Sequence, residues 1–264
     1  MTSEKSTIKY FGWSCFELAF GNQKLYFDPM SRKYCGVQWT KLEDFKDTNV
    51  ICVTHGHQEH YQDVPAVAKF SGATVVSSPT ACKHLNSFYG LDKKKLITIE
   101  PYEDKEVEGF KISAFLWRHR DVSPIKAVFR PKIWNGIKWA WNGLLKCAYN
   151  APFTGFFIEM PDGLKILNYN EGFTYNMEID EVREVADHYK PDILLAGAQM
   201  DFENYVAAGA EIFDPKIVVL YHPHKALFEQ INVSSTTPEK FSSTVQSKLP
   251  NAEIFYAEPG WTYN

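Results

Sequence analysis

The sequence predicts an α/β fold of four layers, in which two mixed β-sheets pack face to face and helices cover both outer faces. Each half of the chain opens with apolar runs joined by hairpin-type turns, and continues with apolar runs that alternate with helical segments. Of the 264 residues, 45% are hydrophobic and 15% are aromatic, which is enough to fill a large core. We expect one domain that spans residues 1–264.

Short strands separated by turns are expected in the first half. The apolar stretch 8–20 has a glycine near its middle, and the Gly-Asn-Gln that follows predicts a hairpin turn into a strand at 24–28. The β-branched runs 50–55 and 74–78 are predicted strands, and a helix is predicted after Pro79. The other strands expected in this half are 96–100 and 110–116, with acidic loop residues between them.

The second half is expected to open with a hairpin and then to alternate helices with strands. A Pro-Asp-Gly turn joins the first two strands, 155–160 and 165–170. The expected elements after this hairpin are a helix near 177–189, a strand at 192–197, a helix near 202–213, a strand at 217–222, a helix over 238–249 and a strand at 253–258. This order is typical of parallel strands joined by crossover helices.

Composition and charge argue against several classes of protein. The formal net charge of −4 gives no reason to expect a nucleic-acid partner. No uninterrupted apolar run approaches the roughly 20 residues of a membrane-spanning helix, and the first residues lack the apolar core of a signal peptide. Five scattered cysteines without a Cys-x-x-Cys pair argue against a disulfide framework and against a thiolate zinc site. We therefore expect a cytoplasmic protein with free thiols.

Residues 117–150 break the strand and helix pattern and are predicted to be an inserted segment. They carry seven basic residues against one acid, and four of the seven tryptophans of the chain. Apolar residues follow a helical spacing at Trp134, Ile137, Trp141, Leu144 and Leu145. Three interpretations stay open: a lid whose Trp134 contacts an apolar substrate while Arg118 and Arg120 attract an anionic group, a helix packed on the core, or a surface for membrane contact or dimerisation.

The strongest chemical signal is a cluster of three histidines in residues 55–60. The cluster directly follows an apolar strand, so the alternate side chains of His55 and His57 can point the same way. Gly56 adds no side chain that would crowd an ion, and Glu59 and His60 approach from the turn that follows. Imidazole and carboxylate groups together suit zinc, manganese or iron, with zinc as our first choice.

Five motifs in order resemble the metallo-β-lactamase superfamily of metal-dependent hydrolases. Its His-x-His-x-Asp-His signature after a buried strand is similar to residues 55–60, and RHRD at 118–121 supplies its next histidine. LNYNEGF at 167–173 resembles the Gly-Asp-Thr-Gly turn of the family, and LYHPH at 220–224 supplies its last histidine. The opening looks like the branch of ascorbate-phosphate lactonases and N-acylphosphatidylethanolamine phospholipase D, on the matches Gly12, Ser14, Asp28 and Pro29.

This resemblance implies a two-metal centre that hydrolyses an ester, lactone, amide or phosphodiester. One ion would be held by His55, His57 and His119, and the second by Glu59, His60 and His222. A water between the ions would attack as hydroxide. Asp28 is expected to orient a histidine from outside the ligand set. The substrate is expected to be a small molecule with an anionic and an apolar part.

Two residues depart from the family pattern. Glu59 stands in place of the signature aspartate and is one methylene longer. When the sequences are aligned on Gly172, Asn170 takes the place of the bridging aspartate, and only a one-residue slip would let Glu171 serve instead. Asn170 is the residue we expect to face the metals, and its neutral amide is a poor bridge. We therefore predict one tightly held metal and a second that is weak or absent.

The last ligand and the overall function each leave an alternative. His222 directly follows an apolar run and is the expected ligand, whereas His224, beyond Pro223, either lines the substrate site or faces solvent. Glu59 and Asn170 suggest, as an alternative to hydrolysis, a weakened or inactive metal- or ligand-binding member of the same fold. Redox chemistry at two irons is a second rival, which the small number of carboxylates disfavours. The oligomeric state stays open.

Overall fold

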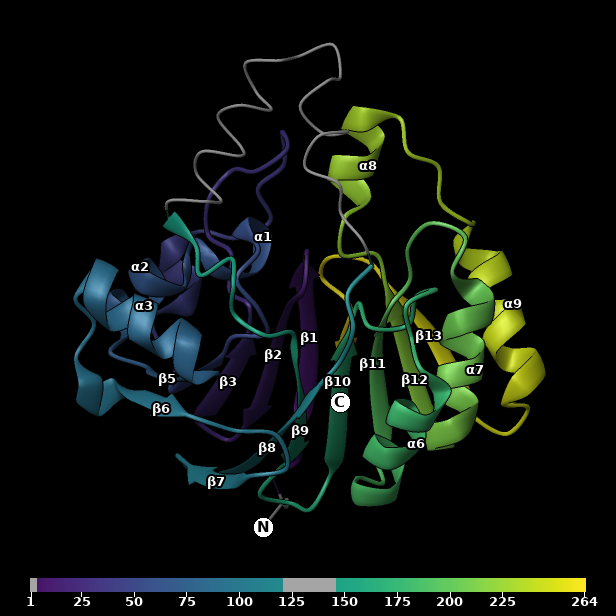
Figure 1. Cartoon of the computed structure of the whole chain (residues 1–264), viewed down its shortest axis with the longest axis horizontal. Coiled ribbons are helices and arrows are strands. Elements are labelled where there is room, and N and C mark those ends of the chain that lie inside the picture. Colours follow the sequence, from purple (N-terminus) through teal and green to yellow (C-terminus); the bar gives the residue numbers. More distant parts are fainter. Residues whose placement is uncertain (1–3, 121–145) are drawn as a thin grey trace.

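A computed structural model describes residues 4–120 and 146–264 and places them in two mixed β-sheets packed face to face (Figure 1). In the described part of the chain, the strand orders of the two seven-stranded sheets are β14-β1-β2-β3-β4-β5-β6 and β13-β12-β11-β10-β9-β8-β7. The strands of the first sheet are β1 (Thr7–Gly12), β2 (Cys15–Phe20), β3 (Gln23–Phe27), β4 (Val50–Cys52), β5 (Thr74–Ser77), β6 (Leu96–Thr98) and β14 (Thr262–Tyr263). The strands of the second sheet are β7 (Asp104–Val107), β8 (Phe110–Leu116), β9 (Thr154–Glu159), β10 (Lys165–Asn170), β11 (Ile193–Gly197), β12 (Ile217–Tyr221) and β13 (Glu253–Ala257).

Each sheet changes from antiparallel to parallel pairing part-way along. Strands β1 to β3 pair antiparallel and β3 to β6 parallel, whereas β7 to β10 pair antiparallel and β10 to β13 parallel. Parallel neighbours need a crossover, usually a helix, to return the chain to the start of the next strand. The carboxyl ends of β10, β11 and β12 therefore lie along one edge of their sheet, together with the end of β8, which runs in the same direction as β10.

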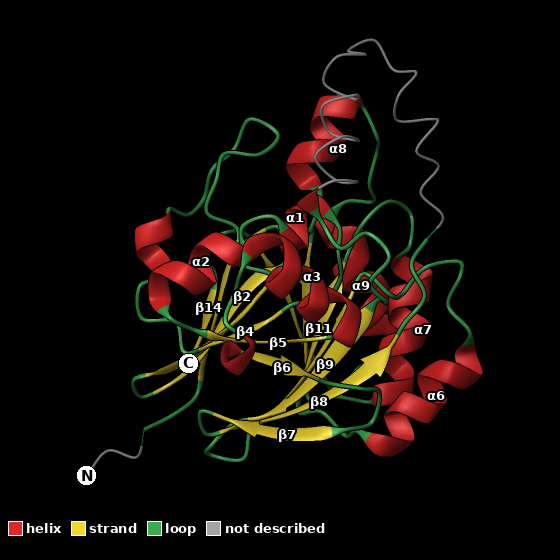
Figure 2. Cartoon of the chain, turned by 60° about the vertical axis from the view of Figure 1, so that its left-hand side comes forward, coloured by secondary structure: helices red, strands yellow, loops and turns green. Residues whose placement is uncertain are grey.

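Helices form the two outer layers. The α-helices are α1 (Gln58–Tyr61), α2 (Val64–Ser71), α3 (Pro79–Tyr89), α6 (Ile179–His188), α7 (Glu203–Phe213), α8 (Lys225–Ile231) and α9 (Pro238–Lys248), and two 3-10 helices are η1 (Leu42–Phe45) and η2 (Lys93–Lys95). Figure 1 shows α2 and α3 against the first sheet and α6, α7 and α9 against the second. Figure 2 shows the same strands enclosed between helices from another side. The predicted fold of four layers is confirmed.

Apolar side chains bury the contact surfaces between the layers. The largest core lies between the sheets and includes Phe16, Phe27, Phe110 and Phe156, each with no exposed surface. A second core joins α6, α7 and α9 to the outer face of the second sheet, and a third joins α2 and α3 to the first. Burial of apolar area at about 25 cal/mol per Å² is the main term that holds such layers together. The two sheets thus form a rigid support for the loops at their ends.

Several elements were missing from the sequence-based assignment. The region of strand β7 was expected to be an acidic loop, because three of its four residues are charged. In the structure, only Val107 of this strand is buried. It pairs with β8 at the edge of the second sheet, where charged side chains discourage pairing with another chain. The predicted stripe at Trp134, and most of the inserted segment, lie outside the described residues.

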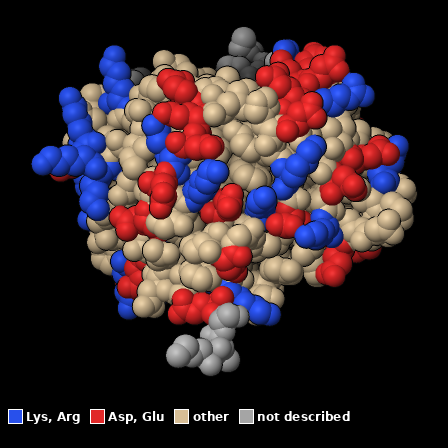
Figure 3. All heavy atoms as spheres, turned by 90° about the horizontal axis from the view of Figure 1, so that it is seen from below, with Lys and Arg blue, Asp and Glu red and all other residues tan. Residues whose placement is uncertain are grey.

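The molecular surface at the end opposite α1 and α8 carries charges of both signs. Figure 3 shows lysines and arginines interspersed with aspartates and glutamates over this face. Among the described residues, helices with the length and apolarity needed to cross a bilayer are absent. In Figure 1, α1 and α8 both lie towards the other end of the sandwich.

Candidate metal centre

Three histidine side chains converge beyond the ends of β4 and β8. His55 and His57 follow β4, and His119 follows β8. One ring nitrogen from each of the three lies within 4.8 Å of the other two, and Nε2 of His55 is 3.0 Å from Nδ1 of His57. The predicted convergence of residues 55, 57 and 119 is therefore present in the structure.

Gly56 lets the chain pack tightly over this loop. A Cβ atom at residue 56 would lie 1.8 Å from the carbonyl oxygen of Ala148, which no side chain tolerates. The next residue, Tyr149, places its ring 5.5 Å from the ring of His57, and its side chain is half-exposed. The glycine between the two histidines thus makes room for residues 148 and 149, which close one side of the cluster.

A second group of donors lies beside the first. Glu59 and His60 come from α1, and His224 comes from the loop after β12. One donor atom from each lies within 4.8 Å of the other two, and Oε1 of Glu59 is 3.0 Å from Nε2 of His224. All three residues are buried, and the Glu59 carboxylate contacts the imidazole of His224.

Glu171 lies between the two groups. Its Oε1 is 3.1 Å from Nε2 of His60 and 3.5 Å from Nε2 of His224, and its Oε2 is 3.4 Å from Nε2 of His119. The residue has 1% exposed surface. This carboxylate reaches histidines of both groups, which is the position that the sequence analysis gave to Asn170.

Asn170 points elsewhere, which corrects the alignment. Its Nδ2 donates to Oδ2 of Asp28 at 3.3 Å and to Oγ1 of Thr54 at 3.1 Å. The pairing of β10 with β11 shifts by one residue between Asn168 and Asn170, and Asn170 has a left-handed φ of 52°. Such a bulge interrupts the alternation of side chains along a strand, so the residue after Asn170 faces the histidines.

Asp28 holds a histidine of the second group. Its Oδ2 accepts from Nδ1 of His60 at 2.7 Å, so Nε2 of that ring is turned towards Glu171. The backbone and the hydroxyl of Thr54 also donate to the Asp28 carboxylate, at 2.8 and 2.6 Å. The oxygen of that hydroxyl can accept from Nδ1 of His55, 3.0 Å away, which leaves Nε2 of His55 free to face the cluster. These contacts fix which nitrogen of each ring is the donor.

His224 occupies the place predicted for His222. Nε2 of His222 lies 2.9 Å from the hydroxyl of Ser235, and its Nδ1 accepts from the backbone of His224. His222 therefore turns away from the cluster, because β12 ends at Tyr221 and strand alternation does not continue through Pro223. Gln199, which the sequence analysis missed, contacts Nδ1 of His224 through Oε1 at 3.2 Å. Its position just beyond the end of β11 is the signal that could have identified it.

Replacement of each of these histidines by alanine distinguishes their roles. We expect His224→Ala to lose one equivalent of bound metal and to lower kcat/KM at least 100-fold, because Glu59 loses its neighbouring donor. His222→Ala, the matched control, is expected to keep its metal and to change kcat/KM less than tenfold. Elemental analysis and steady-state kinetics measure both effects. If His222→Ala lost its metal and activity while His224→Ala kept both, His222 would be the ligand, as the sequence analysis predicts.

The electrostatic environment differs between the two groups. Burial lowers the pKa of His55 well below its usual range and that of His57 to about 3, so both rings are neutral near pH 7 and offer lone pairs. Burial has the same tendency at His60, but the carboxylates of Asp28 and Glu171 outweigh it and raise its pKa to about 10. The two carboxylates therefore favour a positive charge at the position of His60.

The donor set fits a divalent cation. Burial would raise the pKa of Glu59, yet the hydrogen bond from His224 and the nearby histidines lower it to about 2, and the pKa of Glu171 is likewise well below its usual value. Oε2 of Glu59 and Nε2 of His119 are buried and have no hydrogen-bond partner within the described ranges 4–120 and 146–264. Because Nδ1 of His119 donates to the carbonyl of Arg120, its Nε2 carries the lone pair. A cation bound by nitrogen and oxygen donors satisfies both atoms.

The two arginines that were predicted to bind substrate have different surroundings in the structure. Arg118 is exposed and forms a bidentate ion pair with Glu181, at 2.8 and 2.5 Å, so its charge is already neutralised. Arg120 lies with its guanidinium carbon 5.7 Å from the centre of the Phe228 ring. Trp134, the third residue of this prediction, falls outside the described residues.

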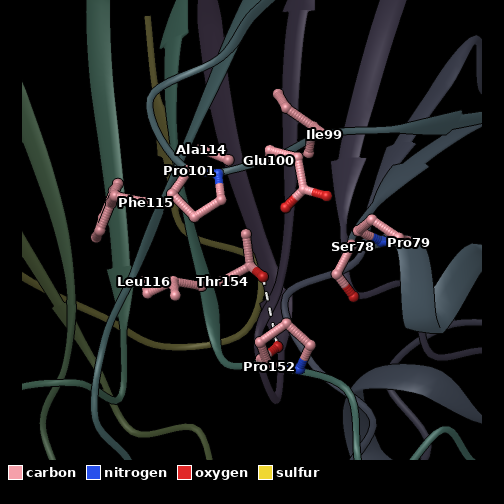
Figure 4. A pocket seen from close by; sticks show the side chains of 10 residues that line it. All are labelled: Ser78, Pro79, Ile99, Glu100, Pro101, Ala114, Phe115, Leu116, Pro152 and Thr154. Atoms are coloured by element: carbon pink, nitrogen blue, oxygen red, sulfur yellow. Dashed lines mark hydrogen bonds between the residues drawn. The ribbon is translucent and has the colours of Figure 1, made fainter.

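A small cavity elsewhere is a weaker candidate for a functional site. It has a volume of about 80 Å³ and lies between the starts of α3 and β9, next to β8 (Figure 4). Figure 4 shows Glu100 and Ser78 among mainly apolar neighbours such as Ile99 and Leu116. Pockets that bind small molecules usually exceed about 300 Å³, so this cavity is too small for most of them.

Comparison with known proteins identifies the family. A family model described as "Beta-lactamase superfamily domain" matches residues 7–144, just over half of the chain. The chain belongs to the β-lactamase superfamily. The resemblance inferred from the histidine motifs is thereby confirmed, whereas the branch suggested by the opening motif stays a prediction.

Similarity to individual proteins covers nearly the whole chain. A UPF0173 metal-dependent hydrolase of Pyrococcus horikoshii is 26% identical over 257 residues, which cover 96% of each chain. The structure of Igni18, a metallo hydrolase of Ignicoccus hospitalis, superposes with a TM-score of 0.68 at 18% identity and covers 98% of this chain and 97% of that one. CmlA, a diiron β-hydroxylase of Streptomyces venezuelae, has a TM-score of 0.66 at 12% identity over 100% of this chain and 55% of that one. The fold alone therefore does not decide between hydrolysis and redox chemistry.

Proposed function

We propose that this protein is a metal-dependent hydrolase that cleaves an ester, lactone, amide or phosphodiester bond of a small molecule. The observation that carries the proposal is Glu171, whose carboxylate lies between the group of His55, His57 and His119 and the group of Glu59, His60 and His224. The name of the Pyrococcus relative supports hydrolysis over redox chemistry. Neutral imidazoles with a few carboxylates favour zinc over manganese or iron.

Each residue of the site has a role that its contacts define. A divalent ion bound here supplies Lewis acidity and lowers the pKa of a coordinated water, so that hydroxide is available near neutral pH. Asp28 and Gln199 hold the outer nitrogens of His60 and His224, which keeps the inner nitrogens aimed at the site. Oε2 of Glu59 and Nε2 of His119 are buried without a hydrogen-bond partner in the described structure, and we assign both atoms to metal binding.

Two metal positions are now the better proposal. The prediction of a weak second site rested on Asn170 as the bridging residue, with Glu59 as the only anionic ligand. With Glu171 between the groups, the second ion has two carboxylates nearby, and its positive charge is compensated. The same geometry argues against the alternative of an inactive family member, because the longer side chain of Glu59 still reaches His224.

Aromatic side chains suit the apolar part of a substrate. The ring of Phe153 stacks on His119 at 4.8 Å and also lies 5.1 Å from His55. Tyr149 lies on the outer side of His57, where it is half-exposed. These rings lie against the first histidine group and give an apolar substrate part surfaces to contact.

Removal and return of the metal tests this function. The protein is stripped with a chelator, dialysed, and assayed with chromogenic esters, lactones, amides and phosphodiesters before and after addition of zinc, manganese or iron(II). We expect turnover of at least one bond class to fall at least 100-fold on removal and to return with zinc. Turnover that persists in protein shown by elemental analysis to hold no metal would contradict the proposal.

A further inference from the structure

Arg120 differs from the other arginines that the structure describes. Arg32 pairs with Asp63, Arg118 with Glu181, and Arg183 with Asp180. For Arg120, residues 4–120 and 146–264 provide no carboxylate within ion-pair distance, and its Nε is buried without a hydrogen-bond partner. A buried N–H on a permanently charged group is costly to leave unsatisfied. The guanidinium is therefore available to an anion that is not part of the described protein.

The position of Arg120 links it to the metal centre. It directly follows His119, whose Nδ1 donates to the Arg120 carbonyl at 2.6 Å. Its guanidinium lies over Phe228 in α8, and the same ring stacks on His224 at 5.7 Å with an interplanar angle of 12°. One aromatic ring thus contacts both the cation and a donor of the second group. An anion bound at Arg120 would therefore lie near the metal centre.

The carboxylates of the site do not compensate this charge. Glu59 contacts His224, and Glu171 contacts His60, His119 and His224. In the described ranges, neither carboxylate forms an ion pair with Arg120. The planar fork of a guanidinium matches the paired oxygens of a carboxylate or a phosphate, which it binds through two parallel hydrogen bonds.

We propose that Arg120 is the anion-binding residue of the substrate site, and that the substrate carries a carboxylate or phosphate group apart from the bond that is cleaved. This inference rests on the proposed hydrolase function, for which it names the substrate class. The guanidinium lies over the ring of Phe228, and this cation–π contact helps to hold it near the metal centre. Arg120 then selects substrates by charge, while the metal centre acts on the scissile bond.

A matched set of substrates tests the selection by charge. Esters of p-nitrophenol with a short alkyl chain are prepared with a methyl ester, a carboxylate or a phosphate at the far end, and the same three ends are made for any other bond class that the metal assay identifies. For zinc-loaded Arg120→Gln we expect KM to rise about 10- to 100-fold for the charged members and less than twofold for the neutral one, with kcat largely unchanged. The larger rise of the two charged members identifies carboxylate or phosphate as the ligand.

A charge-matched control and a second readout complete the experiment. Arg183→Gln removes an exposed arginine of α6 and is expected to change KM less than twofold for every substrate. In the metal-free protein, the Nε–H nuclear magnetic resonance of Arg120, assigned by its absence in Arg120→Gln, is expected to shift in a saturable way with inorganic phosphate or succinate.

The outcomes separate this inference from the hydrolase function. Equal effects of Arg120→Gln on charged and neutral substrates, with a resonance that does not move, would overturn the anion site while hydrolysis stands. A saturable shift of the resonance in a protein that hydrolyses none of the substrates would support the anion site and refute the proposed function.

Discussion

Glu171→Gln is expected to release at least one metal ion per chain and to lower kcat/KM by roughly 10²- to 10³-fold. The variant keeps the shape of the side chain but removes the negative charge that faces His60, His119 and His224. Loss of one partner in a buried charged cluster costs about 3–5 kcal/mol, because the remaining charge stays uncompensated. Elemental analysis and steady-state kinetics measure the two effects.

Asn170 provides the matched control for this prediction. Asn170→Gly keeps a residue that tolerates the left-handed φ of 52°. It removes the donations to Asp28 and Thr54 and the hydrogen bond accepted from Ser14. We expect it to keep both ions and to lower kcat/KM about tenfold or less. The double variant Asn170→Asp/Glu171→Asn is expected to be as inactive as Glu171→Gln. Recovery of activity in that variant would place the bridging carboxylate at position 170 after all.

His57→Ala is expected to abolish turnover while the fold persists. The change removes one of three nitrogens within 4.8 Å of each other, so the first group keeps only His55 and His119. Two neutral donors hold a divalent ion much more weakly than three, and we expect a loss of kcat/KM of about 10³-fold or more. Circular dichroism and kinetics on the same preparations separate loss of activity from loss of structure.

The control for this variant is a histidine remote from the centre. His188 lies at the exposed end of α6 and stacks on Tyr102. His188→Ala is expected to keep its metal and to change kcat/KM less than twofold. Activity of His57→Ala equal to that of His188→Ala would exclude His57 from the reaction.

Much of the fold could be predicted because the apolar runs report buried strands directly. The runs that became β4, β11 and β12 are buried throughout, and the predicted elements of the second half match the observed order. Edge strand β7 was missed because its charged residues face water, and α8 was missed because its seven residues show little apolar periodicity. Apolar patterns predict the elements that are buried in the core. They fail for elements whose side chains mostly face solvent, because such elements show no apolar periodicity.

Within the site, residues on regular elements were predictable and those after irregular backbone were not. His55, His57 and His60 follow a strand and start a short helix, so their spacing indicates their convergence. Glu171 follows a bulge and His224 follows a proline, and neither deviation can be read from side-chain alternation. For this reason the structure brings Glu171 and His224 to the cluster, one and two residues beyond the predicted Asn170 and His222. Arg118 was misjudged because its partner, Glu181, lies 63 residues away in the sequence.

Anomalous X-ray diffraction from crystals of zinc-reconstituted protein tests the central claim most directly. The predicted map has two peaks, one contacted by His55, His57 and His119 and the other by Glu59, His60 and His224, with the Glu171 carboxylate touching both. A single peak, or peaks that these side chains do not contact, would contradict a two-metal centre bridged by Glu171.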